Sequence, residues 1–212
     1  MVIKAILFDL GGVIVNIDFS NFNNIVMSSI PVPRDQMTLN QEYSQLSDLY
    51  HRGEITDKKF YNQICNSFEI DKNHLTQSIF FNAYNSIILD FNLDVLEILE
   101  KLKYKKKYKL ICLSNINSSH FNLLKKKNWK FIKYFDELIF SHEVHLTKPN
   151  LDIFKLSIQK ADCPAQEILL IDDGLDNIES ARKLGIIGIH YKNPKDLIKK
   201  LKELGIELLV SN

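Results

Sequence analysis

Six residues at four places in the chain are of the types that bind a cation and a phosphoryl group. They are Asp9, Ser114, Asn115, Lys148, Asp172 and Asp173. Their carboxylates cannot all stay ionised at close range without a cation, and oxygen ligands alone favour a hard ion such as Mg²⁺. A lysine, a hydroxyl and backbone N–H groups at a helix N-terminus suit a phosphoryl group, which a nearby carboxylate can attack to form an aspartyl phosphate.

The first of these places is an apolar run, AILFDLGGVIVNI at residues 5–17, interrupted by one acid and two glycines. A buried carboxylate costs several kcal/mol unless it is paired or bound to a metal, so Asp9 is expected to have a cationic partner. Gly11 and Gly12 are expected to let the backbone turn sharply after the strand and come close to a ligand.

Strand and helix patterns alternate through most of the chain. Apolar runs predict strands buried on both faces at residues 2–8, 108–114, 137–141, 167–172 and 186–191. Periodic apolar positions predict helices at residues 93–102, 151–161, 176–184 and 194–204, the last two followed by Gly185 and Gly205. This alternation predicts an α/β fold with a Rossmann-like, doubly wound parallel sheet, and ligands bind such sheets at the carboxyl ends of the strands. The four places lie at those ends.

Residues 18–90 do not follow this alternation. They are predicted to be helical and amphipathic, with Thr56 or Asp57 as an N-cap before Phe60, Ile64 and Phe68. We therefore predict a Rossmann-like core formed by residues 1–17 and 91–212, and a small all-helical cap at 18–90, inserted after the first strand.

Composition narrows the classes of function. The chain of 212 residues is 45% apolar and 25% charged, and its formal net charge of +1 gives no broad reason to expect a nucleic-acid partner. No window approaches ~18 uninterrupted apolar residues and no convincing signal peptide is present, so no membrane partner is expected. The three cysteines, an odd number without a CxxC pair, indicate reduced thiols. A cytoplasmic monomer or homodimer is expected.

The motifs together resemble those of a known family. They are Asp9-Leu10-Gly11-Gly12-Val13, Ser114-Asn115, Lys148-Pro149 and Asp172-Asp173. In this order and spacing they resemble the four motifs of the haloacid-dehalogenase-like hydrolase superfamily, and the helical insertion resembles the small cap of its subfamily I. The resemblance implies a Mg²⁺-dependent phosphatase that acts on a small phosphorylated substrate.

The resemblance also implies a role for each motif residue. Asp9 would attack phosphorus and ligate Mg²⁺, the carbonyl of Gly11 would be a second ligand, and Asp172 and Asp173 would hold the metal directly or through water.

The remaining motif residues would contact the substrate. Ser114 would hydrogen-bond a phosphoryl oxygen, Asn115 would help with its backbone N–H, and Lys148 would neutralise charge on the nucleophile and the transferring group. The stretch YHRGEITDKKF resembles the substrate-facing cap loop of phosphosugar-handling relatives, so Arg52 and His51 are candidate substrate contacts. The alternative is a plain helix–helix turn that ends at Gly53.

One position departs from the family pattern. Phosphatases of the family usually carry a second aspartate two residues after the nucleophile, as a general acid and base worth about 10²- to 10⁴-fold. This chain has Gly11 there. The enzyme could act on a good leaving group such as a sugar 1-phosphate, and the chain is similar to bacterial glucose-1-phosphate phosphatases that also have glycine.

Two other interpretations of Gly11 stay open. The protein could be a metal-independent dehalogenase-type hydrolase, although the Asp172-Asp173 pair would be a poor choice for a site without metal. It could also be a catalytically weak phosphate- or partner-binding protein. His142 and His145 are candidate substitute acids, with unperturbed pKa values near about 6.5. Relatives usually have glycine at the position of His145, and histidine is among the residues that tolerate positive φ.

Overall fold

The computed structural model describes residues 2–32, 35–127 and 129–208, and its centre is a five-stranded parallel sheet in the order β5-β4-β1-β6-β7. The strands of this sheet are β1 (Ala5–Phe8), β4 (Lys109–Ser114), β5 (Glu137–Phe140), β6 (Ile168–Asp172) and β7 (Ile187–His190). From β1 the chain adds β4 and β5 on one side and then β6 and β7 on the other. The sheet is therefore doubly wound, and the predicted Rossmann-like α/β fold is confirmed.

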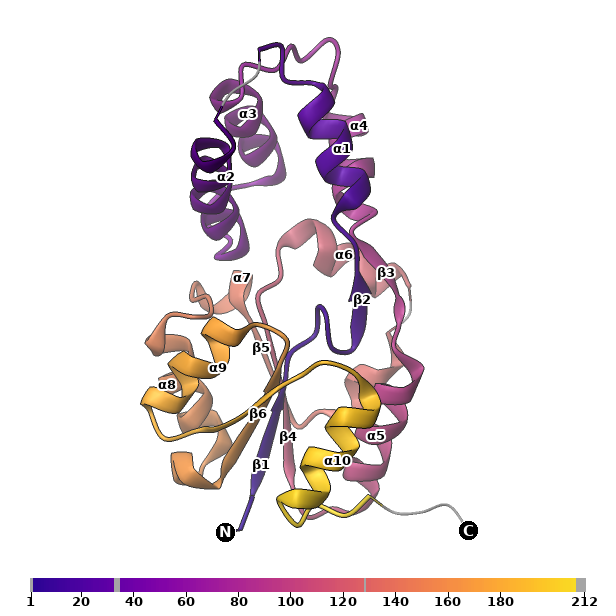
Figure 1. The fold of residues 1–212 in the computed structure, drawn as a ribbon, viewed down its shortest axis with the longest axis vertical. Helices are drawn as coiled ribbons and strands as arrows, with labels where there is room; N and C mark the ends of the chain where they lie inside the picture. The colour runs from indigo at the N-terminus through magenta and orange to yellow at the C-terminus, as the bar shows by residue number, and fades with distance from the viewer. Residues whose placement is uncertain (1, 33–34, 128, 209–212) are drawn as a thin grey trace.

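Helices cover both faces of the sheet (Figure 1). They are α5 (Leu93–Tyr104) and α10 (Pro194–Glu203) on one face, and α8 (Leu151–Ala161) and α9 (Leu175–Lys183) on the other. Because side chains alternate along a strand, Ile6 and Phe8 of β1 pack with α5 and α10, whereas Ala5 and Leu7 pack with α8 and α9. This two-faced burial accounts for the continuous apolar runs in the sequence.

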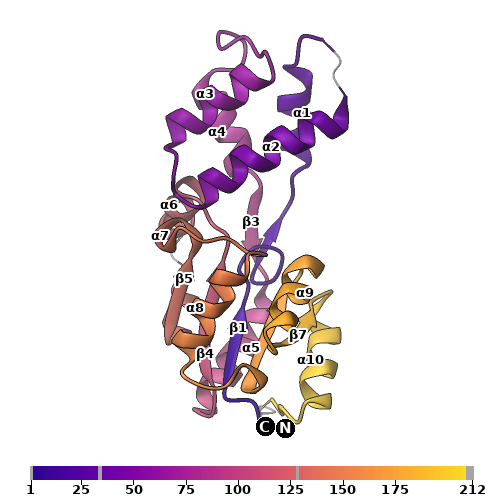
Figure 2. The ribbon, with the colours of Figure 1, turned by 90° about the vertical axis from the view of Figure 1, so that its left-hand side faces the viewer.

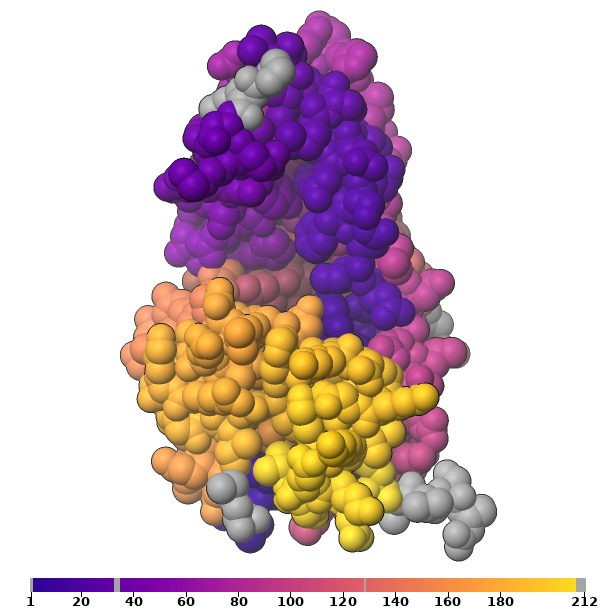
Figure 3. All heavy atoms as spheres, in the orientation of Figure 1, coloured from indigo at the N-terminus to yellow at the C-terminus, as the bar shows by residue number. Residues whose placement is uncertain are grey.

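Four further helices form a separate part at the carboxyl end of the sheet (Figures 1 and 2). These helices are α1 (Ser20–Ser28), α2 (Gln36–His51), α3 (Asp57–Ser67) and α4 (Gln77–Asn85). A two-stranded antiparallel ribbon, β2 (Val15–Ile17) and β3 (Ile88–Phe91), connects this four-helix part to the sheet. In the space-filling view the surface is set back where the two parts meet (Figure 3).

The four-helix part has a hydrophobic cluster of its own, rich in aromatic rings. Tyr50 stacks on Phe60 with ring centroids 4.3 Å apart, and Phe22 and Phe80 pack edge to face. Short polar contacts attach it to the rest of the molecule. Thr147 donates to Asp48 at 2.6 Å, Ser118 to Asp57 at 2.6 Å, and Ser119 to Asn85 at 2.8 Å.

The remaining helical segments join the strands of the sheet. They are α6 (Ser118–Lys126), α7 (Ser141–Val144) and two short 3₁₀ turns, Lys130–Tyr134 and Ala165–Glu167. Most helices begin at a polar side chain that accepts a hydrogen bond from a backbone N–H in the first turn, which satisfies an otherwise unpaired donor. These N-caps are Asp35, Thr56, Thr76, Asn92, Asn117, Asn150 and Asn193.

The structure bears out most of the predicted elements. All five predicted strands of the sheet are present, the first beginning at Ala5 rather than at residue 2. Thr56 is the N-cap of α3, and Gly185 and Gly205 follow α9 and α10 with positive φ. The ribbon β2–β3 was not predicted, because its strands are short. The division into residues 1–17, 18–90 and 91–212 stays a proposal, and its second boundary falls within β3.

Two expectations about the whole chain also bear on the fold. The three cysteines are free thiols, two of them buried. Within the described residues, every helix is too short or too polar to span a bilayer.

Candidate active site

Strand register brings Asp9 and Asp172 together. β1 and β6 run parallel with Phe8 opposite Ile171, and the N–H of Asp9 donates to the carbonyl of Ile171 at 2.9 Å. Asp9 is therefore the first residue beyond β1, beside Asp172, the last residue of β6. Both side chains are buried. The two carboxylates thus meet at the carboxyl edge of the sheet, where its winding reverses.

Lys148 lies between these two carboxylates. Its Nζ is 2.9 Å from Oδ1 of Asp9 and 2.6 Å from Oδ2 of Asp172. Burial alone would lower the pKa of Lys148, but the two carboxylates outweigh it and raise the pKa above its usual range. Burial raises the pKa of Asp9 to about 8 against the opposing effect of Lys148. Lys148 is therefore the cationic partner that the buried Asp9 was expected to have.

A third carboxylate completes the cluster. Asp9, Asp172 and Asp173 each offer an oxygen within 4.8 Å of the other two. If all three carboxylates are ionised, Lys148 balances one of their negative charges. The two negative charges that remain equal in number the positive charges of one divalent cation. The donors are all oxygen atoms, the set that hard cations prefer. The residues present therefore fit the predicted magnesium ion.

Two glycines and an asparagine fix these carboxylates. Gly12 has φ +75°, and a Cβ there would lie 2.1 Å from Oδ2 of Asp173. Oδ1 of Asp172 accepts hydrogen bonds from the N–H of Gly174 and from Nδ2 of Asn177, each at 2.8 Å. Gly12 is thus required both for its conformation and for the close approach of Asp173.

Gly11 differs from its neighbour. Its φ is not positive, and a Cβ there would meet only Ile17, at an ordinary distance of 3.7 Å from its Cγ2. The positive φ of Gly12 agrees with the expected turn, whereas the backbone conformation of Gly11 does not require glycine, and its close approach to a ligand stays a prediction. The structure has room for a side chain at position 11.

Ser114 is the last residue of β4, on the other side of β1, and Asn115 follows it. Ser114 is buried at the end of the strand and lines the cavity described below. The side-chain amide of Asn115 accepts from the N–H of Lys148 and donates to its carbonyl, both at 2.8 Å. Asn115 therefore holds the backbone that carries Lys148, a role that the sequence did not reveal.

Three other candidate residues lie at the junction with the four-helix part. Arg52 is paired with Asp48 and Glu54, each at 3.1 Å, and is not among the residues that line the cavity. Its carbonyl is 2.8 Å from Nδ1 of His145, which has the left-handed φ of 58°. His142 also lies outside that lining, with its backbone carbonyl close to Gly53.

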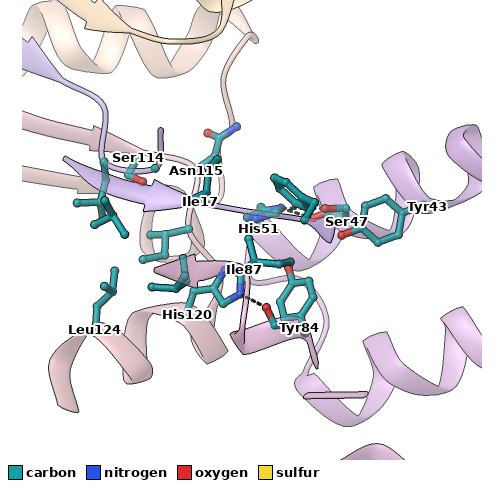
Figure 4. A pocket seen from close by; sticks show the side chains of 16 residues that line it. Ile17, Tyr43, Ser47, His51, Tyr84, Ile87, Ser114, Asn115, His120 and Leu124 are labelled. Carbon is teal, nitrogen blue, oxygen red and sulfur yellow. Dashed lines mark hydrogen bonds between the residues drawn. The ribbon is translucent and has the colours of Figure 1, made fainter. Parts of the chain in front are cut away.

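A cavity of about 230 Å³ extends from the sheet edge under the four-helix part (Figure 4). Its apolar lining includes Leu10, Val15, Ile17, Ile87, Ile88 and Leu124. Gly11, Ser114 and Asn115 line it beside the carboxylate cluster. In Figure 4, Ser114 and Tyr43 lie at opposite ends of the cavity. The motifs therefore contribute one end of the cavity, and the ribbon and the helices α2, α4 and α6 contribute the rest.

Asn117, which sequence reasoning missed, organises the polar part of this wall. As the N-cap of α6 its Oδ1 accepts from the N–H of His120, so its Nδ2 turns the other way. There Nδ2 donates to the Tyr84 hydroxyl at 2.9 Å and lies 3.3 Å from both Nε2 of His51 and Nδ1 of His120. Only the Asn117 N-cap pattern after Ser114-Asn115 could have drawn attention to it.

Both histidines of this network are neutral. The second nitrogen of His51 is 2.8 Å from the carbonyl of Ser47, and that of His120 is 3.0 Å from the carbonyl of Tyr84. Since a carbonyl only accepts, these nitrogens carry the protons, and the nitrogens facing Asn117 are the unprotonated ones that share its two amide hydrogens with the Tyr84 hydroxyl. Burial lowers the pKa of His51 and lowers that of His120 to about 4.

The doubly wound α/β fold places Asp9, Asp172 and Lys148 together at the switch point of the sheet, where proteins of this class bind their ligands. The family model of haloacid dehalogenase-like hydrolases matches residues 3–185, and the chain belongs to this family.

Named relatives include phosphatases. The D-ribitol-5-phosphate phosphatase of Bacteroides thetaiotaomicron is 26% identical over 94% of this chain and 97% of its own length. The sesquiterpene phosphatase astK of Aspergillus oryzae is 23% identical over 95% and 96%. The drimenol cyclase drtB of Aspergillus calidoustus is 26% identical over 99% of this chain, which spans only 39% of that protein.

Solved structures show the same fold. A HAD family enzyme from Bacteroides thetaiotaomicron, in complex with magnesium and inorganic phosphate, is 27% identical with a TM-score of 0.71 and covers 90% of this chain and 94% of that one. A predicted HAD-like hydrolase from Porphyromonas gingivalis is 21% identical, with a TM-score of 0.78 over 98% of this chain and 100% of its own.

Proposed function

We propose that the protein is a Mg²⁺-dependent phosphatase that hydrolyses a small phosphorylated metabolite through an aspartyl phosphate on Asp9. One observation carries this proposal. Lys148 is buried in contact with both Asp9 and Asp172 at the carboxyl edge of the sheet, and Asp173 offers an oxygen within 4.8 Å of an oxygen of each of these acids. Magnesium and phosphate bound to a related HAD family enzyme support it.

Asp9 is the proposed nucleophile. Its Oδ1 accepts hydrogen bonds from the N–H of Leu10 at 2.7 Å and from Lys148, which fix the carboxylate. Attack by Asp9 forms a bond to phosphorus and breaks the bond from phosphorus to the ester oxygen, which leaves as an alcohol after taking a proton from water. A second water then hydrolyses the aspartyl phosphate to inorganic phosphate and restores Asp9.

Lys148 and Ser114 are the proposed contacts to the transferring group. The ammonium of Lys148 neutralises charge on Asp9 and on the phosphoryl oxygens, and the hydroxyl of Ser114 donates to one of those oxygens. The backbone N–H of Asn115 is the proposed additional donor, while its side chain positions Lys148. Arg52, engaged by two acids of the four-helix part, stays a candidate substrate contact only if those pairs open.

Four groups are the proposed holders of the metal ion: the carboxylates of Asp9, Asp172 and Asp173 and the carbonyl of Gly11. A bound Mg²⁺ would offset the surplus negative charge and act as a Lewis acid toward the phosphoryl group. Asp172 is anchored through both oxygens, by Lys148 on one side and by Gly174 and Asn177 on the other. That anchoring gives the site the fixed ligand geometry that Mg²⁺ demands.

Substrate identity is open in this proposal. Two relatives are named for substrates of opposite polarity, a ribitol phosphate and a sesquiterpene, and the sequence resemblance favoured a sugar phosphate. The expected partner is a small phosphorylated molecule rather than a nucleic acid or a membrane, and a cytoplasmic monomer or homodimer stays a prediction.

Release of phosphate from p-nitrophenyl phosphate, with Mg²⁺ and after chelation with EDTA, tests the proposal. A phosphatase of this design loses its activity on chelation and regains it when Mg²⁺ is restored. Full phosphate release in EDTA would overturn the dependence on Mg²⁺, and 2-haloacid hydrolysis without metal would support the dehalogenase alternative. Binding of phosphate with Mg²⁺ but no turnover of any phosphate ester would show a binding protein.

A further inference from the structure

The cavity beside the carboxylate cluster carries no formal charge. No Asp, Glu, Lys or Arg is among its lining residues in the part of the chain that the structure describes. The two histidines in its wall are held neutral by Asn117 and by backbone carbonyls. Charge is thus confined to the sheet edge, where a phosphoryl group would be held.

Most polar groups in the wall already have partners within it. The protonated nitrogens of His51 and His120 face backbone carbonyls, and Asn117 shares its two amide hydrogens among the Tyr84 hydroxyl and the other two ring nitrogens. The amide of Asn115 is paired with the backbone of Lys148. A polyol that entered the cavity would bury several hydroxyls with few free partners, and buried hydroxyls without partners are unfavourable.

We propose that the substrate is the phosphate monoester of an apolar alcohol, whose hydrocarbon body fills this cavity, and that Tyr43 limits the chain length that fits. This inference rests on the proposed phosphatase function. The phosphoryl group binds at Asp9 and Lys148, and the alcohol extends past Gly11 and Ser114 along Ile17 and Ile87 (Figure 4).

Cavity volume sets the expected size of the alcohol. An apolar cavity of about 150 Å³ holds benzene, so by proportion about 230 Å³ has room for about nine carbon atoms. Each methylene of the alcohol that moves from water into such a cavity makes binding more favourable, until the cavity is full.

Tyr43 closes the far end. It lines this cavity and also a second one of about 280 Å³ inside the four-helix part, between α1 and α2. The second cavity is bordered by Phe22, Val26, Leu39 and Phe68, and none of its described lining residues is charged. The Tyr43 ring packs against Phe22 with centroids 5.9 Å apart. Tyr43 therefore lies between two cavities whose described lining residues carry no formal charge.

A series of n-alkyl monophosphates tests the substrate class, because their leaving groups are chemically alike and differ only in length. With Mg²⁺, kcat/KM is expected to rise about fourfold per methylene from butyl phosphate to a plateau near nonyl phosphate. Ribitol 5-phosphate is expected to be at least about a hundredfold poorer than octyl phosphate. A flat series, or a preference for ribitol 5-phosphate, overturns the inference.

Substitutions of Tyr43 test the wall. Tyr43→Ala is expected to move the plateau about four or more carbons further, because it joins the two cavities. Tyr43→Phe keeps the ring and is expected to keep the wild-type plateau. Tyr43→Leu removes part of the ring between the two cavities and is expected to move the plateau by fewer carbons. It tests the role of Tyr43 if the alanine variant does not fold. An unchanged plateau in a folded Tyr43→Leu enzyme overturns the role of Tyr43.

The same assay separates this inference from the function on which it rests. Mg²⁺-dependent hydrolysis of p-nitrophenyl phosphate with no dependence on alkyl length refutes the apolar alcohol and leaves the phosphatase intact. Loss of all phosphate release in every substrate refutes both. Non-hydrolysable octylphosphonate, measured by calorimetry with Mg²⁺, is expected to bind with a negative heat-capacity change, and a value near zero overturns the inference.

Discussion

At the carboxyl edge of the sheet, the ionisable side chains of Asp9, Lys148 and Asp172 are buried in contact, whereas the adjoining cavity is lined by side chains that carry no formal charge. Each region is assembled differently. The charged residues sit at strand ends, where the register of a parallel sheet brings them together. The cavity is built from the ribbon and from helices α2, α4 and α6.

This difference indicates that the two regions have separate functions, one in catalysis and one in substrate selection. Under the proposed function, the charged edge holds and transfers the phosphoryl group of every substrate, because its ligands and donors contact only phosphate and metal. The neutral cavity would contact the alcohol and would discriminate among substrates through apolar burial and through the scarcity of free polar partners. Changes at the edge should therefore lower activity on every substrate, and changes in the cavity should alter which substrate is preferred.

The largest expected effect comes from removing the nucleophile at the charged edge. Asp9→Asn should lower the rate of phosphate release at least about ten-thousandfold on alkyl and aryl phosphates alike, because the amide oxygen is a poor nucleophile. Stopped assays of inorganic phosphate with Mg²⁺ measure this loss.

The matched control is Asp90→Asn, which removes an exposed carboxylate of β3 and should keep wild-type activity. Circular dichroism of both variants should match the wild type. A folded Asp9→Asn enzyme with substantial activity on any one substrate would contradict the assignment of Asp9.

A smaller effect, on stability, should come from the neutral wall of the cavity. His120 stays neutral in the folded protein, with its pKa lowered to about 4 by burial, whereas an unfolded histidine titrates near about 6.5. Between these values the unfolded chain binds a proton that the folded one excludes, so this group lowers stability as the pH falls from 6.5 towards 4. The loss amounts to about 3 kcal/mol.

Urea denaturation of wild type and His120→Gln at pH 7 and pH 4.5 isolates this contribution. The variant should lose less stability on acidification than the wild type, by about 2 kcal/mol over this pH range. His74→Gln, which changes an exposed histidine, should behave like the wild type. Equal acid sensitivity of His120→Gln and wild type would show that His120 is not held neutral.

The smallest expected effect lies at the border of the two regions. Gly11→Asp adds the carboxyl group that related phosphatases carry, at a position with room for a Cβ and no positive φ. We expect kcat for octyl phosphate to rise about tenfold, because an alkoxide leaving group needs a proton, and kcat for p-nitrophenyl phosphate to change less than about twofold.

Gly11→Ala is the matched control, since it fills the same space without an acid, and it should not raise kcat for octyl phosphate above the wild-type value. If Gly11→Asp leaves kcat for octyl phosphate unchanged, or raises both substrates equally, the missing general acid does not limit turnover.

The fold and the charged edge were largely predictable from the sequence. Buried strands have a recognisable apolar pattern, and a carboxylate at the end of one is unusual enough to draw attention, as with Asp9 and Asp172. The positive φ of Gly12 agrees with its assignment to the turn, whereas residue type alone does not reveal that the φ of Gly11 is not positive.

The cavity was not predictable for a physical reason. Ile17, Tyr43, Tyr84 and Leu124 are ordinary apolar or aromatic residues, and only the packing of the four-helix part against the sheet places them around one space. Asn117 reads as an N-cap in the sequence, and its contacts with both histidines depend on tertiary structure.

A crystal structure of the protein with Mg²⁺ and octylphosphonate tests the separate functions of the two regions most directly. The account predicts Mg²⁺ on Asp9, Asp172 and Asp173, the phosphonate against Lys148 and Ser114, and the alkyl chain in the cavity directed at Tyr43. A phosphonate bound away from Asp9, or an alkyl chain that lies in solvent while the cavity stays empty, would contradict it.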